Sequence, residues 1–372
     1  MADGPFANLR VVELAAVLAG PQVGQFFAEL GAEVLKIEPP GGDVTRAWRT
    51  AAEAPDAPVS AYFAASNWGK ACLTADLRQP ADRAAVQALA AGADVVISSY
   101  KPGAAEKLGV DYPTLAVLNP RLIYGHLTGY GPENPRPGYD AVLQAEAGFM
   151  HLNAPGPGQP PQKMPVAFID LLAAHQLKEG LLTALYQREK TGRGALVEVS
   201  LLASALASLA NQGSTWLLTG HDPAPLGSGH PSIVPYGTVY EALDGQRLVL
   251  AVGTDGQFGQ LCAALARPEW PADARFATNP ARVQHRAALE ALLTARIAEV
   301  TGAGLLADLE RRAVPAGAVR TVGQALAHPA AAALRLPGAG FDGLRTVSFR
   351  SDAWAVAAAL RPPGSPGPSP AA

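Results

Sequence analysis

Residues 9–38 read LRVVELAAVLAGPQVGQFFAELGAEVLKIE, in which a helical stretch joins two short apolar runs. The runs at 9–14 and 32–37 have the length and apolar content of buried strands. Between them we expect a loop and a helix that ends at Gly31, because glycine is common just after a helix. A strand, a helix and a second strand at this spacing predict a parallel βαβ unit.

The same alternation of strands and helices continues to about residue 200. The expected elements are a helix at 80–91, a strand at 94–98, a helix at 111–118, a strand at 122–126, a helix ending near 189 and a strand at 196–199. A further long helix is expected over 201–218. This order predicts an α/β fold with a Rossmann-like, doubly wound parallel sheet.

The chain has 372 residues, more than one hydrophobic core usually holds, so two domains are expected. After the long helices the composition shifts to a predicted β-hairpin and several short helices, which are typical of a smaller α+β domain. The expected boundaries are a large Rossmann-like domain at 1–220, a small domain at 225–320, a return segment at 321–360 and a disordered Pro-rich tail at 361–372.

Composition argues against several classes of protein. Lys and Arg total 29 and Asp and Glu total 32, so the net charge of −3 gives no electrostatic case for nucleic acid or an anionic membrane as the main partner. The two cysteines lie far apart and the histidines show no metal-binding spacing, so we expect neither a disulfide framework nor a metal site. Without a signal peptide or a membrane span, a cytoplasmic location is expected.

Asp170 stands out because it lies in the apolar run Val-Ala-Phe-Ile-Asp-Leu-Leu at 166–172. A carboxylate among large apolar groups is costly unless it is paired, hydrogen-bonded or used. Asp170 is placed to be the N-cap of the long helix that follows, and the helix N-terminus would keep it ionised. An ionised carboxylate can also act as a covalent nucleophile, so capping and catalysis both stay open and are compatible.

Two common phosphate-binding motifs are missing from the first strand-to-helix turn. Residues 20–24 read Gly-Pro-Gln-Val-Gly, whereas a dinucleotide fingerprint needs G-x-G-x-x-G there. No G-x-x-x-x-G-K-[ST] occurs, which argues against a P-loop enzyme. The helix N-terminus in this turn still offers a nucleotide its free N–H groups.

A series of motifs, taken in order, resembles family III CoA-transferases of the CaiB/BaiF type, the group of formyl-CoA transferase and carnitine CoA-transferase. Each motif is short, but their order and spacing over about residues 9–330 make the resemblance specific. The matching stretches are 11–14, 19–21, 30–43, 76–78, 100–103, 118–124, 128–131, 139–140 and 191–194, with Asp170 at the family's nucleophile position.

The resemblance implies a large Rossmann-like domain and a small domain, with two chains interlocked in a homodimer. It implies that Asp170 forms a covalent aspartyl intermediate as CoA passes from an acyl-CoA donor to a carboxylic acid acceptor. CoA and acyl-CoA would then be substrates, with no permanently bound cofactor. The CoA contacts that the resemblance implies are Leu18, Ala19, Pro39, Asp76, Leu77, Arg78, Ser99, Tyr100, Lys101, Lys107 and Tyr139.

Within this set, Arg78, Lys101 and Lys107 are expected to meet phosphates, which bind cations or free N–H groups. The oxyanions of the acyl transfers need N–H donors, for which the helix start after Asp170 and the glycines Gly227 and Gly229 are candidates.

Two alternatives remain open. Acyl-CoA racemases of the same superfamily pair the equivalent Asp with a His before an Asp, whereas this chain has Tyr139 before Asp140. His126 or His151 would replace that histidine only if the fold brings them near Asp170. A catalytically silent CoA-binding relative is the other alternative, because Ala174 replaces a glycine usual in the family and the family's C-terminal segment is absent.

Overall fold

The computed structural model describes residues 4–338 and 340–367 and divides into two compact units. The first unit comprises Met1–Ala147, Pro165–Ala210 and Pro329–Ala372, and the second comprises Gly148–Met164 and Asn211–His328. Residues 148–164 and 211–220 therefore belong with the second unit, although the sequence-based boundaries placed them in the large domain, and so do residues 321–328, which were placed in the return segment.

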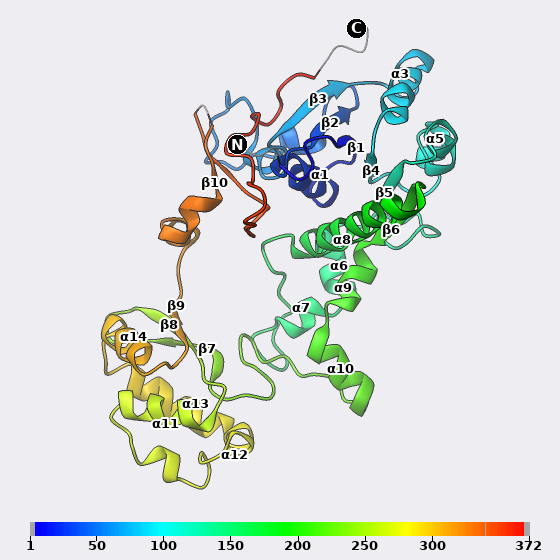
Figure 1. The fold of residues 1–372 in the computed structure, drawn as a ribbon. Helices are drawn as coiled ribbons and strands as arrows, with labels where there is room; N and C mark the ends of the chain where they lie inside the picture. The colour runs from blue at the N-terminus through cyan, green and yellow to red at the C-terminus, as the bar shows by residue number, and fades with distance from the viewer. Residues whose placement is uncertain (1–3, 339, 368–372) are drawn as a thin grey trace. The chain divides into compact units, whose positions relative to one another are not determined.

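The first unit is built on a six-stranded parallel sheet with the strand order β3-β2-β1-β4-β5-β6 (Figure 1). Its strands are β1 Arg10–Leu14, β2 Glu33–Glu38, β3 Lys70–Thr74, β4 Val95–Ser98, β5 Ile123–Thr128 and β6 Ala195–Ser200. The strand order reverses between β1 and β4, as in a doubly wound nucleotide-binding sheet. The predicted fold class is confirmed, although β3 was not predicted.

Helices cover both faces of this sheet. Two neighbouring residues of β5, Tyr124 and Gly125, illustrate this, because successive residues of a strand face opposite sides of the sheet. The Tyr124 hydroxyl donates to the Val110 carbonyl at 2.9 Å, within the cluster that also holds α3 and α5 side chains. On the other face a Cβ at Gly125 would lie 3.1 Å from Leu177 of α8. The helices of this unit are α1 Ala19–Glu29, α2 Ala61–Ala64, α3 Pro80–Ala91, α4 Ala104–Lys107, α5 Tyr112–Leu118, α6 Asp140–Glu146, α8 Phe168–Thr191 and α9 Leu201–Ala207, with the 3₁₀ turns η1 Val44–Ala47 and η3 Pro329–Leu334.

The single helix expected over 201–218 is wrong. The chain instead forms α9 and a second helix, α10 Ala210–Thr219. Ala210 has a φ of +48°, a left-handed conformation that cannot continue a right-handed helix.

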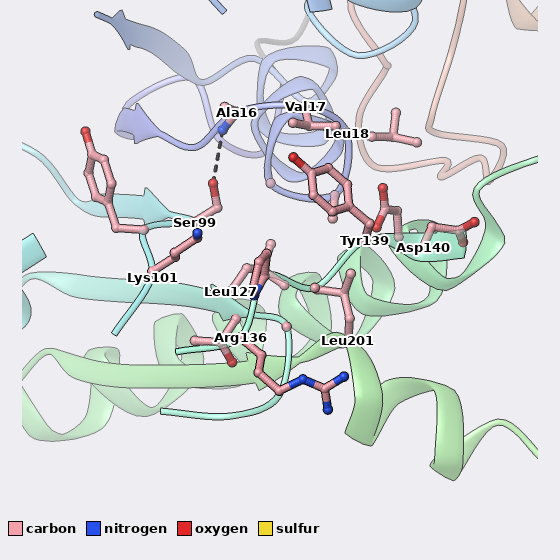
Figure 2. Close-up of a pocket in the computed structure, with 18 of the residues that line it drawn as sticks. Ala16, Val17, Leu18, Ser99, Lys101, Leu127, Arg136, Tyr139, Asp140 and Leu201 are labelled. Carbon is pink, nitrogen blue, oxygen red and sulfur yellow. Dashed lines mark hydrogen bonds between the residues drawn. The ribbon is translucent and has the colours of Figure 1, made fainter. Parts of the chain in front are cut away.

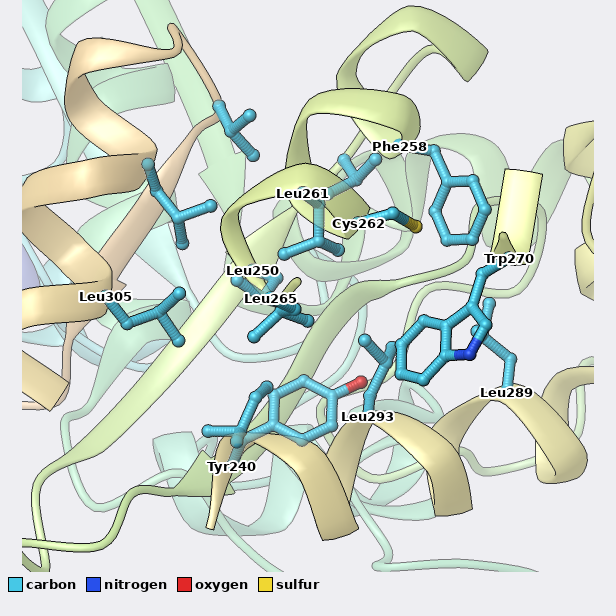
Figure 3. Close-up of a cluster of buried hydrophobic side chains, with 14 of the residues drawn as sticks. Tyr240, Leu250, Phe258, Leu261, Cys262, Leu265, Trp270, Leu289, Leu293 and Leu305 are labelled. Atoms are coloured by element: carbon cyan, nitrogen blue, oxygen red, sulfur yellow. The ribbon is translucent and has the colours of Figure 1, made fainter. Parts of the chain in front are cut away.

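The second unit contains the predicted hairpin and helices around a core of its own (Figure 3). Strands β7 Tyr236–Glu241, β8 Arg247–Ala251 and β9 Ala316–Ala318 form an antiparallel sheet in that order. Tyr240, Leu250, Leu261 and Leu293 are among the buried side chains that pack the helices on this sheet. The helices are α7 Phe149–Leu152, α11 Asp255–Ala264, α12 Asn279–Gln284, α13 Arg286–Ile297, α14 Gly302–Arg311 and α15 Val322–Leu326, with the 3₁₀ turn η2 Trp270–Ala272; α10 begins at the boundary of this unit.

The C-terminal part of the chain returns to the first unit. A short hairpin of β10 Arg335–Leu336 and β11 Gly343–Leu344 leads to residues Thr346 and Val347, whose N–H groups donate to the buried Glu29 carboxylate. Residues 361–367 then run beside β3. The disorder predicted from residue 361 is therefore wrong up to residue 367, and the rest of the predicted tail lies outside the described residues.

Backbone hydrogen bonds hold residues 361–367 against β3. The Cys72 N–H donates to the Ser365 carbonyl at 2.8 Å, and the Gly367 N–H donates to the Cys72 carbonyl at 2.6 Å. The segment thereby satisfies backbone groups of an outer strand that would otherwise have no partner strand on that side.

Within residues 4–338 and 340–367, no helix combines the length and the apolar content that a bilayer crossing requires. The same residues contain no group of three or more His, Cys, Asp or Glu side chains placed to hold a metal ion. Cys72 and Cys262 are free thiols.

Candidate active site

A cavity of about 250 Å³ lies at the carboxyl ends of β1, β4 and β5, where the strand order of the sheet reverses. Ligands of open α/β sheets bind at this position. Figure 2 shows the residues that follow β1, at 16–18, opposite those that follow β4, with Tyr139 and Asp140 beside them. Asp170 at the start of α8 also lines this first cavity, as does Leu201 of α9.

A second cavity of about 410 Å³ adjoins the first. It lies over the ends of β2 and β3 and is lined by residues 36–40 and 75–78. Ala16 and Tyr100 line both cavities, so the two form one track across the carboxyl edge of the sheet.

Asp170 is the third residue of α8, not its N-cap, because the helix begins at Phe168. The reason lies in another helix, where the Asp140 carboxylate accepts the Ile169 N–H at 2.9 Å. Asp140 thus accepts a free N–H of the first turn of α8, which the side chain of an N-cap residue would otherwise accept. Asp170 is 8% exposed and makes no hydrogen bond or ion pair with the described residues.

The electrostatic surroundings of Asp170 also differ from the sequence-based expectation of an ionised carboxylate. Burial, and after it the negative charge of Asp140, raises the pKa of Asp170 to about 7. Asp140 itself accepts a hydrogen bond from the Gln144 amide at 2.7 Å. Near neutral pH, Asp170 is therefore present in both protonation states.

The structure gathers most of the predicted CoA contacts along the two cavities. Leu18, Ala19, Ser99, Tyr100, Lys101 and Tyr139 line the first cavity with Asp170. Pro39, Asp76, Leu77, Arg78 and Tyr100 line the second. Lys107 lines neither of them; it is exposed at the end of α4, next to Leu108 of the second cavity.

Arg78 and Lys101 are both exposed at the cavity rims, where a cation can meet an anionic ligand. The Arg78 guanidinium is held by the Asp76 carboxylate, with Nε and Nη2 donating at 2.8 and 2.9 Å. This pairing fixes the direction of the arginine side chain over the second cavity.

Several residues that line the first cavity with Asp170 were not predicted, among them Val17, Arg136 and Leu201, and Asp140 was named only as the neighbour of Tyr139. Val17 and Leu201 carry no chemical signal in the sequence, since apolar residues there read as core. Asp140 did give a signal in the sequence, because it follows Gly138 and Tyr139 as the first residue of a short helix.

Arg136 belongs to a closed loop at 130–137. Its Nη2 donates to Glu146 at 2.6 Å, and its guanidinium stacks over the Tyr130 ring at 4.2 Å. The neck of the loop is tight, because a Cβ on Gly129 would lie 2.5 Å from the Gly138 Cα. These contacts fix the backbone that leads directly into Tyr139 and Asp140.

No histidine in the described residues lines the first cavity. His126 Nε2 instead donates to the Tyr100 carbonyl at 2.9 Å, and Nδ1 lies 3.7 Å from Glu198. His151 belongs to the second unit. The described residues therefore give Asp170 no histidine partner in this cavity for acid–base chemistry.

The two glycines proposed as oxyanion donors also belong to the second unit. The Gly227 N–H donates to the Ala154 carbonyl and the Gly229 N–H donates to the Leu226 carbonyl, each at 2.9 Å. Both donors are thus already engaged within their own unit.

Comparisons with known proteins agree with this geometry. A model of CoA-transferase family III matches residues 6–344. The succinate–glutarate CoA-transferase of Agrobacterium fabrum is 40% identical over 332 residues, which are 87% of this chain and 82% of the relative. The acetyl-CoA:oxalate CoA-transferase of Acetobacter aceti is 35% identical over 334 residues, which are 89% of this chain and 84% of the relative.

A solved structure is similar over nearly the whole chain. The crystal structure of a CaiB/BaiF family protein from Brucella suis matches with a TM-score of 0.85 and 40% identity, covering 98% of this chain and 97% of that chain. The resemblance read from the ordered motifs is confirmed. The chain belongs to CoA-transferase family III and is a CoA-transferase.

Proposed function

We propose that this CoA-transferase moves CoA between two carboxylic acids through a covalent intermediate on Asp170. The observation that carries the proposal is Asp170 itself, a largely buried carboxylate that lines the cavity and has no hydrogen-bond or ion-pair partner in the described residues. A carboxylate that is desolvated and unpaired is more nucleophilic than one held by donors.

The reaction balances without any further reagent. Ionised Asp170 attacks the thioester carbonyl of the donor, the C–S bond breaks, and CoA thiolate leaves behind a mixed anhydride. The thiolate attacks the Asp170 carbonyl of that anhydride, which releases the donor acid and leaves an aspartyl-CoA thioester. The acceptor carboxylate and the released thiolate then repeat the two steps in reverse, giving the new acyl-CoA and free Asp170.

The two adjoining cavities support an elongated ligand such as CoA. In this proposal the second cavity takes the nucleotide, with Arg78 at its rim, and the first takes the thioester beside Asp170. Lys101, and Lys107 on the exposed end of α4, supply positive charge for the phosphates. Pro39, Leu77 and Tyr139 supply apolar surface along the track.

The proposed substrates are small dicarboxylic acids and their CoA thioesters. The names of the relatives give succinate and glutarate for one and acetyl-CoA and oxalate for the other; succinate, glutarate and oxalate each carry two carboxyl groups. The first cavity, at about 250 Å³, has the size for a short acyl group and part of the pantetheine arm.

The proposal is tested by trapping the intermediate. The protein is incubated with succinyl-, glutaryl-, oxalyl- and acetyl-CoA, quenched with hydroxylamine, and the peptide containing Asp170 is examined by mass spectrometry. We expect a hydroxamate on Asp170 that depends on the donor and is absent from Asp170→Asn.

Undiminished CoA exchange in Asp170→Ala would contradict the nucleophile. If instead the α-hydrogen of a bound acyl-CoA exchanges with solvent deuterium while no CoA moves, the activity is that of an acyl-CoA racemase. CoA binding with neither reaction would point to a catalytically silent relative.

We also propose a cytoplasmic homodimer, on the basis of the free thiols and the family resemblance. Light scattering that shows a stable monomer would contradict the dimer.

A further inference from the structure

The backbone at Val17 is unusual for its residue type. Val17 has a φ of +72° and lines the first cavity, where Figure 2 shows it between Ala16 and Leu18. A β-branched residue rarely adopts positive φ, and such a conformation persists only where the surrounding structure holds it. The contacts that hold Val17 in this conformation therefore help to determine the shape of the first cavity.

Three consecutive backbone groups beside Val17 are held by side chains from three other parts of the chain. The Ala15 carbonyl accepts from Lys36 Nζ at 2.7 Å. The Ala16 N–H donates to Ser99 Oγ at 3.1 Å, the bond that Figure 2 marks. The Val17 N–H donates to Asp43 Oδ2 at 3.3 Å.

Two of these holding side chains, Lys36 and Asp43, line the second cavity and belong to a cluster of charges, which we call the buried charge cluster: Glu13, Lys36, Asp43 and Lys70. Lys36 Nζ lies 3.1 Å from Asp43 and 2.9 Å from Glu13, and Lys70 Nζ lies 2.7 Å from the other Glu13 oxygen. All four residues are at most 3% exposed. With two positive and two negative charges, the cluster is balanced and each charge has an opposite partner.

Asp43 is itself fixed in place. Its Oδ1 accepts the Thr45 N–H at 3.0 Å and the Thr45 hydroxyl at 2.7 Å, and its own N–H donates to Glu38 at 2.8 Å. Burial alone would raise the pKa of Asp43, but Lys36 and Thr45 together lower it below its ordinary value. Val17 thus donates to an ionised and rigid acceptor.

We propose that Asp43 is a positioning residue for CoA transfer, which holds Val17 in its strained conformation and so shapes the cavity wall around Asp170. The inference rests on the proposed function. If Asp43 were only structural, its loss would destabilise the sheet but leave kcat of the folded enzyme unchanged, because Val17 would keep its conformation without the bond.

The first test compares two Asp→Asn variants. Each removes one negative charge from a carboxylate that accepts a backbone N–H, at opposite ends of β1. Donors now use both Asp43 oxygens, Thr45 at Oδ1 and Val17 with Lys36 at Oδ2, so Asp43→Asn, with one oxygen left, loosens Val17 beyond the end of β1. Asp94→Asn is the matched control, since Asp94 accepts the Arg10 N–H at 2.9 Å at the start of β1 and pairs with Arg188 at 3.1 Å. We expect Asp43→Asn to lower kcat by about 10- to 100-fold, the loss that misplaced catalytic geometry causes.

The Michaelis constant separates positioning from binding. Asp43 lines the second cavity but is only 3% exposed there, so in Asp43→Asn we expect KM for acyl-CoA to change by less than about threefold. In Asp94→Asn both constants should stay within about threefold of wild type even where the melting temperature falls. A lowered melting temperature with unchanged kcat in Asp43→Asn overturns the proposal.

The second test is a rescue. Glycine adopts positive φ freely, so in Val17→Gly the backbone at residue 17 can keep its positive φ with less need of the bond to Asp43. We expect the fold-loss in kcat caused by Asp43→Asn to be smaller in the Val17→Gly background than in the wild-type background. Equal losses in the two backgrounds overturn the proposal.

A measurement independent of activity completes the design. Hydrogen–deuterium exchange should accelerate in the peptide covering residues 15–18 of Asp43→Asn and not in the same peptide of Asp94→Asn. Unchanged exchange in this peptide of Asp43→Asn overturns the proposal.

If Asp43→Asn fails to fold, Thr45→Val takes its place. It removes one hydrogen bond to Asp43 and should lower kcat and accelerate exchange, as expected for Asp43→Asn. If wild-type protein transfers no CoA, the proposed function fails while the exchange measurement still tests the hold on Val17.

Discussion

At the scale of single residues, Asp140 acts on the charge state of Asp170, the nucleophile of the proposed mechanism. Asp140 accepts the Ile169 N–H and the Gln144 amide, whereas Asp170 has no such donors among the described residues. Burial and the Asp140 charge raise the pKa of Asp170 to about 7. In the proposed mechanism the ionised carboxylate is the attacking group, so protonation of Asp170 would switch the reaction off.

This arrangement predicts the pH dependence of the enzyme. As pH rises through about 7 the ionised fraction of Asp170 increases, so kcat/KM should rise and reach a plateau above that pH. Asp140→Asn removes the negative charge and keeps an oxygen that can accept the Ile169 N–H, so the midpoint of the profile should move to lower pH. A pH–rate profile of both proteins checks this, and an unchanged midpoint in Asp140→Asn would contradict the role of its charge.

At the scale of elements, α8 approaches the sheet closely enough that glycine is required. A Cβ on Gly180 would lie 2.6 Å from Val197 Cγ1 of β6. Overpacking of this kind costs about 1–3 kcal/mol, and the better helix propensity of alanine returns up to about 1 kcal/mol. Gly180→Ala should therefore lower the free energy of unfolding by about 1–2 kcal/mol, as measured by urea denaturation.

Gly259 in α11 is the matched control, because no atom lies within 4 Å of its added Cβ. Gly259→Ala should leave stability unchanged or raise it by up to about 1 kcal/mol. Equal behaviour of the two variants would show that the close approach of α8 to β6 is not a constraint.

The elements also show what the sequence can and cannot reveal. β1 and β2 were predicted to within a residue, because continuous apolar runs mark buried parallel strands. β3 was missed because Lys70 reads as an exposed residue, and its burial depends on Glu13, 57 residues away. The start of α8 was misplaced for the same reason, since its N–H acceptor, Asp140, lies 29 residues earlier.

At the scale of the whole molecule, the C-terminal residues complete the first unit. Residues 361–367 cover β3, the outer strand of the six-stranded sheet. A chain ending at Leu360 should lose the three backbone bonds that Gly69 and Cys72 make with residues 361–367, and be less stable by about 1.5–4.5 kcal/mol, at about 0.5–1.5 kcal/mol for each bond. A chain ending at Gly367 is the control, and light scattering on warming should show aggregation in the shorter chain first. Identical behaviour of the two chains would show that the cover is dispensable.

The pairing of Cys72 with Pro366 has a consequence for biosynthesis. The strand is made about 290 residues before the segment that covers it. At about 5–20 residues per second, its outer edge stays open on the ribosome for roughly 15–60 s. For that interval the nascent chain presents the unpaired backbone groups of β3 to its neighbours, which are the groups through which exposed strands aggregate.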